Sequence, residues 1–148
     1  MAKLFLYILV FLTCFFLDKL TKNLANERLI LHTPVQLTKR FYLVLAHNKG
    51  AAYGFLKKRT FLLRFLSAVS MFLLMALFVY CFNNDYSPGF MIAMSVVLAG
   101  AAGNFLERIL LGRVTDFLYY KWRKLPIFNL ADLFLVLGVL GIYGNVLF

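Results

Sequence analysis

The sequence predicts an all-α membrane protein with four transmembrane helices and a small β-containing loop region outside the membrane. Of its 148 residues, 63% are hydrophobic and only 15% are charged, whereas a soluble domain has roughly 25% charged residues. Four apolar segments each approach or exceed the length of about 20 residues that a helix needs to cross a bilayer. We therefore expect residues 1–148 to form a single integral membrane domain. The predicted spans are 4–24, 61–82, 90–111 and 128–148.

The first span resembles a signal peptide at its start, because residues 4–17 are almost entirely apolar. No small-residue cleavage site follows, and three more apolar segments come later, which favours an uncleaved span. To reach residue 24 the helix must include Asp18 and Lys22. These residues are four apart and share a helical face, so they can form an ion pair near the membrane interface. A structural ion pair and a direct chemical role are both open.

Residues 25–60 are polar enough to leave the membrane. Within them, residues 35–47 alternate apolar and polar side chains, as a half-buried strand does. The strand leads into a segment from Asn48 to Gly54 that is rich in glycine and alanine. Such a segment suits tight turning and close approach to the backbone of a ligand. It lacks the Gly-Lys-Ser/Thr pattern of a phosphate-binding loop.

Two aspartates stand where the third span ends and the fourth begins. Asp116 follows Gly112, which ends the third helix, and Asp132 lies near the start of the fourth. If both segments are membrane helices, these aspartates lie near the same bilayer face. Carboxylates near hydrocarbon are costly and usually serve a function. A pair of them indicates acid/base chemistry, in which one proton is shared.

Other polar residues flank the two aspartates. Asn104 and Arg108 share a face of the third helix, with Glu107 beside them, and we expect these three to form a polar contact between helices. Asn129 and Asp132 are three apart, so both can point into the bundle from the first turn of the fourth helix. An acidic group there also meets the favourable end of the helix dipole.

The segment between the last two spans should lie at the membrane interface. Residues 114–117 are expected to be extended or in a turn, and residues 119–124 supply an aromatic and basic interfacial belt. The formal charge is +10, but no nucleic-acid motif accompanies it. We therefore expect anionic lipid headgroups, and not nucleic acid, as the partner of the basic residues. The cysteines and histidines show no metal-ligand spacing, so no metal or other cofactor is expected.

Four sequence blocks, taken together, resemble the lipoprotein signal peptidase family (signal peptidase II). They are DKLTK at 18–22, NKGAAYGF at 48–55, GNFLERILLGRVTDF at 103–117 and FNLADLFLVLG at 128–138. The resemblance implies an aspartic endopeptidase with Asp116 and Asp132 as its catalytic pair. Two positions differ from the usual pattern of the family: this chain has Glu107 where the family usually has Asp, and Tyr53 where it usually has Phe. The resemblance also implies substrate-binding or supporting roles for Asp18, Lys22, Asn48, Gly50, Asn104, Arg108 and Asn129. We expect Gly54 to join them, because the loop from Asn48 to Gly54 could cover the substrate peptide.

The resemblance also implies a substrate and a location. The substrate would be a prolipoprotein whose cysteine carries diacylglycerol, cut just before that cysteine. The enzyme would be a multi-pass monomer of the bacterial cytoplasmic (inner) membrane, in contact with membrane lipid and with its active site at the outer face. Charge counting gives the opposite orientation, because ten of the 16 Lys and Arg residues lie at 19–64 and five at 108–124. We give the sequence blocks more weight than the charge count.

Two other functions fit the same residues less well. A small proton-coupled transporter could use Asp116 and Asp132 as a relay, but transporters place such groups near mid-membrane and often contain internal repeats. A non-enzymatic assembly subunit could use the charges only to pair helices. The sequence leaves open which aspartate is protonated at rest.

Overall fold

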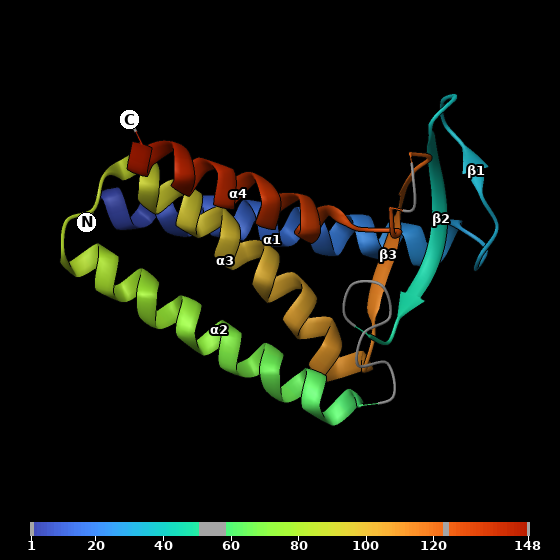
Figure 1. Ribbon diagram of the computed structural model, residues 1–148, viewed down its shortest axis with the longest axis horizontal. Coiled ribbons are helices and arrows are strands. Elements are labelled where there is room, and N and C mark those ends of the chain that lie inside the picture. The colour runs from blue at the N-terminus through green and yellow to red at the C-terminus, as the bar shows by residue number, and fades with distance from the viewer. Residues whose placement is uncertain (1, 51–58, 123–124, 148) are drawn as a thin grey trace.

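The computed structural model describes residues 2–50, 59–122 and 125–147. In these residues, four helices are long and apolar enough to cross a membrane, which confirms the predicted fold class. Figure 1 shows the sheet at one end of the helices and both chain ends at the other. The elements are α1 (Ala2–Arg28), β1 (Val35–Gln36), β2 (Phe41–Asn48), α2 (Thr60–Asn83), α3 (Pro88–Leu111), β3 (Val114–Tyr120) and α4 (Leu130–Leu147).

Helix α3 is the central helix and packs against α1, α2 and α4. Small residues allow two of these approaches. A Cβ atom on Gly100 would collide with the backbone carbonyl of Ala131 on α4, and one on Gly103 would collide with the carboxylate of Asp18 on α1. The outward faces of α1, α2 and α4 instead expose large apolar side chains, which suits contact with lipid.

Helix α3 ends at a glycine whose backbone adopts the left-handed conformation. Gly112 has φ of +67° and donates its N–H to the carbonyl of Arg108. A side chain is strained at this φ, which explains the glycine. The turn sends the chain directly into β3, so Asp116 follows the end of α3 closely.

The sheet has the order β1-β2-β3 and is antiparallel. In the register of β2 with β3, Asn48 lies opposite Val114 and Ala46 lies opposite Asp116. One part of the sheet packs on the end of α1, where Leu45 and Phe117 are buried with Ala25. The sheet is therefore fixed to the end of the helix bundle.

Three boundaries differ from the sequence-based expectation. The single strand expected at 35–47 is two strands, β1 and β2. The chain turns between them, where the backbone N–H groups of Leu37 and Thr38 donate to the carbonyl of Phe41. Residues 114–120 form one continuous strand, since they pair with β2 from a distant part of the sequence. Helix α4 begins at Leu130 and not at residue 128, because Phe128 pairs with Leu118 in an isolated bridge.

Candidate active site

Asp116 and Asp132 line one cavity of about 210 Å³ at the sheet end of the helices. Asp116 comes from β3, whereas Asp132 comes from the first turn of α4. The structure thus brings together two carboxylates that are 16 residues apart in the sequence. The other lining residues are Asn48, Asn104, Arg108, Val114, Pro126, Ile127 and Phe128.

Asn129 joins the two aspartates directly. Its side-chain Nδ2 donates to Asp116 Oδ1 at 2.7 Å, and its backbone N–H donates to Asp132 Oδ2 at 3.2 Å. The backbone N–H of Asp132 donates in return to Asn129 Oδ1 at 3.0 Å. This reciprocal pair is a capping box, which satisfies N–H groups that a helix start leaves free. The same contacts therefore begin α4 and orient the two carboxylates.

Two further asparagines donate to the remaining oxygens of the pair. Asn48 Nδ2 donates to Asp116 Oδ2 at 3.1 Å, and the backbone N–H of Gly50 holds Asn48 by donating to its Oδ1 at 2.9 Å. Asn104 Nδ2 donates to Asp132 Oδ1 at 2.8 Å. Every oxygen of both carboxylates therefore accepts a hydrogen bond, which leaves little rotational freedom to either side chain.

The two aspartates differ in how deeply they are buried. Asp116 is only 4% exposed, while Asp132 is half-buried. Burial, and then the negative charge of Asp132, raises the pKa of Asp116 from its ordinary 3.8 to about 6, although Asn48 and Asn129 oppose this change. At mildly acidic pH, Asp116 therefore keeps a proton beside an acceptor, which is the arrangement that general acid–base catalysis requires.

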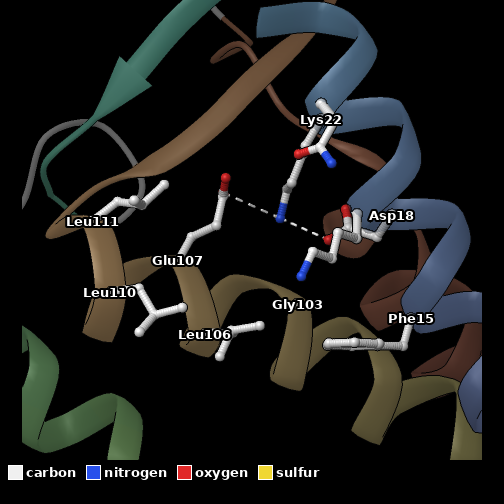
Figure 2. A pocket seen from close by; sticks show the side chains of 10 residues that line it. Phe15, Asp18, Lys22, Gly103, Leu106, Glu107, Leu110 and Leu111 are labelled. Atoms are coloured by element: carbon white, nitrogen blue, oxygen red, sulfur yellow. Dashed lines mark ion pairs between the residues drawn. The ribbon is translucent and has the colours of Figure 1, made fainter.

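Asp18 and Lys22 lie behind the aspartates and do not line their cavity. They form the expected ion pair, which is 2.7 Å long and buried inside the helix bundle. Lys22 Nζ also donates to Asn104 Oδ1 at 3.0 Å, and Asp18 Oδ1 accepts the backbone N–H of Ala131 at 2.9 Å. Both residues line a second cavity of about 200 Å³ between α1 and α3 (Figure 2). They thus support the site from the far side of Asn104.

The sequence analysis missed one contact of Glu107. Its Oε2 accepts the backbone N–H of Thr115 and its Oε1 accepts the Thr115 hydroxyl, each at 2.8 Å. Glu107 also lies 3.5 Å from Lys22 across the α1–α3 interface, as expected of a polar contact between helices. The only sequence signal for the Thr115 contact is its position next to Asp116, since nothing local places it against α3.

Arg108 lines the cavity of the two aspartates, while Gly54 lies in residues 51–58, outside the described residues. Among the residues that the structure does describe, no cluster of three or more His, Cys, Asp or Glu could hold a metal ion.

Comparison with known proteins identifies the family of this chain. A family model described as signal peptidase (SPase) II matches residues 10–148. A lipoprotein signal peptidase of Maridesulfovibrio salexigens is 35% identical over 155 residues, covering 98% of this chain and 99% of that protein. One of Symbiobacterium thermophilum is 35% identical over 126 residues, covering 82% and 81%.

Solved structures of a bacterial membrane enzyme match the fold as well. Two of them superpose with TM-scores of 0.84 and 0.82 at 29% sequence identity. The matches cover 95% of this chain and 87% or 92% of the other. From the family match, the relatives and the four membrane-spanning helices, we conclude that this chain belongs to the signal peptidase II family of membrane proteases.

Proposed function

We propose that this protein is an aspartic endopeptidase that removes the signal peptide from diacylglyceryl-modified prolipoproteins, cutting before the lipidated cysteine. Asp116 and Asp132 are its catalytic pair. The observation that carries the proposal is that both carboxylates line one cavity and are bridged by Asn129. The relatives are named lipoprotein signal peptidases, which supports the choice of substrate.

The two aspartates take different parts in amide hydrolysis. Asp132 is the general base, since it is the less buried of the two aspartates and lines the cavity, where a water molecule can reach it. It takes a proton from the attacking water, while the proton of Asp116 goes to the carbonyl oxygen of the substrate. As the tetrahedral intermediate collapses, the C–N bond breaks, Asp132 gives its proton to the leaving amine, and Asp116 takes back a proton from a hydroxyl of the intermediate. Asp116 fits the acid role because its pKa is raised to about 6.

The position of the site suits a substrate held in a membrane. Asp116 follows α3 and Asp132 begins α4, so the cavity lies at the ends of the apolar helices and not midway along them. This depth favours a peptidase over a proton-coupled transporter. We place the site at the outer face of the inner membrane, with the acyl chains of the substrate and the surrounding lipids against the apolar outer helix faces. The supporting asparagines hold the pair, and the enzyme acts as a monomer.

The test uses purified protein with a diacylglyceryl-modified prolipoprotein and the same precursor without lipid. Wild type should release the signal peptide only from the lipidated precursor, and mass spectrometry should place the cut before the cysteine. Asp116→Asn and Asp132→Asn should each fold, shown by circular dichroism, and cleave nothing. Asp85→Asn is the matched control, because Asp85 is exposed in the α2–α3 turn at the other end of the bundle. Cleavage by either dyad variant would refute the proposed roles.

A further inference from the structure

We propose that Glu107 is a positioning residue for this reaction: its carboxylate fixes the strand that carries Asp116, and Lys22 couples it to the contacts that hold Asp132. The inference rests on the proposed function and adds Glu107 to the supporting residues that the sequence analysis expected. Its basis is a set of buried contacts between α1, α3 and β3.

The first contact is between Glu107 and Thr115, the residue immediately before Asp116. One carboxylate oxygen accepts the Thr115 backbone N–H and the other accepts its hydroxyl, both at 2.8 Å. Thr115 is 1% exposed, so water cannot replace these bonds. The carbonyl of Thr115 accepts Asn129 Nδ2 at 3.3 Å. Side chains therefore satisfy both backbone groups of Thr115, and these bonds set the course of β3 one residue before Asp116.

The second contact is between Glu107 and Lys22, whose side chain is 2% exposed. Figure 2 shows the Lys22 ammonium between the carboxylates of Glu107 and Asp18, at distances of 3.5 and 2.7 Å. Its remaining partner is Asn104 Oδ1 at 3.0 Å. Lys22 thus makes one hydrogen bond, to Asn104, and two ion pairs, with Asp18 and Glu107.

These contacts link the two halves of the catalytic pair. From Lys22, one arm passes through Asn104 to Asp132, at 3.0 and 2.8 Å. The other passes through Glu107 to Thr115 and so to Asp116. A carboxylate at position 107 supplies two acceptor oxygens for β3 and a negative charge for Lys22. Neither a neutral nor a shorter side chain supplies both at the same distances.

Glu107→Gln tests the charge and the second acceptor at nearly constant volume. We expect kcat to fall roughly 10- to 100-fold, as for a displacement of reacting groups by about 1 Å, with KM changed by less than about twofold. The variant also removes a negative charge beside Lys22, whose positive charge lowers the pKa of Asp116. The high-pH limb of the kcat profile should therefore move to lower pH. The other charged groups near Asp116 are Arg108 on α3 and Asp132 on α4.

Three more variants separate positioning from folding. Glu107→Asp keeps the charge on a shorter chain and should recover part of kcat, with the pH profile of wild type. Thr115→Val removes the hydroxyl contact and should lower kcat in the same direction. In the double variant of Glu107→Gln and Thr115→Val, the losses should be less than multiplicative, because both substitutions weaken the Glu107–Thr115 contact. Thr115→Val also removes the hydrogen bond that Asn26 Nδ2 donates to the Thr115 hydroxyl. Glu27→Gln is the control, since Glu27 is exposed on α1.

The assay measures kcat, KM and the pH profile for each variant against the lipidated precursor, with the folded fraction from circular dichroism. If Glu107→Gln keeps kcat within about twofold of wild type, or loses it only in proportion to lost folded protein with an unmoved pH profile, the inference is wrong. If that variant does not fold, Thr115→Val decides: a kcat per folded protein within about twofold of wild type would contradict the inference. Failure of wild type itself to cleave would instead contradict the proposed function.

Discussion

Asp116 should make the stability of this protein depend on pH, and one substitution should remove that dependence. Burial and the charge of Asp132 raise the pKa of Asp116 from 3.8 to about 6. Because the fold favours the protonated carboxyl, this contribution to stability is present below about pH 4 and is lost as pH rises through about 6. The two pKa values differ by an amount that corresponds to about 3 kcal/mol at 25 °C.

The amide side chain of the Asp116→Asn variant cannot ionise, so the variant does not lose this stability as the pH rises. The amide has one acceptor oxygen in place of two, so one of the hydrogen bonds from Asn48 and Asn129 is lost, at about 1 kcal/mol. At pH 8 we therefore expect the variant to be roughly 2 kcal/mol more stable than wild type, and at pH 4 about 1 kcal/mol less stable. The two stability curves should cross between these pH values.

The assay is the free energy of unfolding in detergent micelles, followed by circular dichroism from pH 4 to pH 8. Other groups titrate in this range, so the relevant quantity is the difference between variant and wild type at each pH. Asp85→Asn, at an exposed carboxylate, is the control and should change the free energy of unfolding by less than about 0.5 kcal/mol. A difference for Asp116→Asn that is constant with pH, within about 0.5 kcal/mol, would refute a raised pKa for Asp116.

Further predictions concern the same site and its packing. In wild type, kcat/KM should fall above about pH 6, when Asp116 loses its proton; a rate that is flat from pH 5 to pH 8 would exclude Asp116 as the acid. Gly103→Ala places a methyl group against the carboxylate of Asp18 and should cost about 1–3 kcal/mol in thermal or chemical unfolding, whereas Gly144→Ala, which meets nothing within 4 Å, should not destabilise. Lys22→Met leaves Asp18 and Glu107 without their shared counter-ion and should cost about 3–5 kcal/mol; adding Asp18→Asn to that variant should restore part of the loss, and no restoration would contradict the ion-pair account.

Much of the fold follows from local features of the sequence. Four apolar segments determine four helices, because a helix satisfies its backbone within the segment and needs only enough apolar length to cross the hydrocarbon. The end of α3 is equally local, since Gly112 adopts the left-handed conformation that other residues avoid. The start of α4 depends on Asn129 and Asp132, three residues apart, which cap one another.

Tertiary structure decided the rest. Residues 114–120 became a strand only because β2, more than 60 residues earlier, lies beside them, and no local pattern indicates that partner. The contact of Glu107 with Thr115 and the three contacts of Lys22 likewise depend on how α1, α3 and β3 pack. Helices and their caps arise from interactions between residues a few positions apart, whereas strand pairing and buried polar networks join residues that meet only when the chain folds. The sequence thus identified which aspartates to examine, and the packing of distant elements determined how they are held.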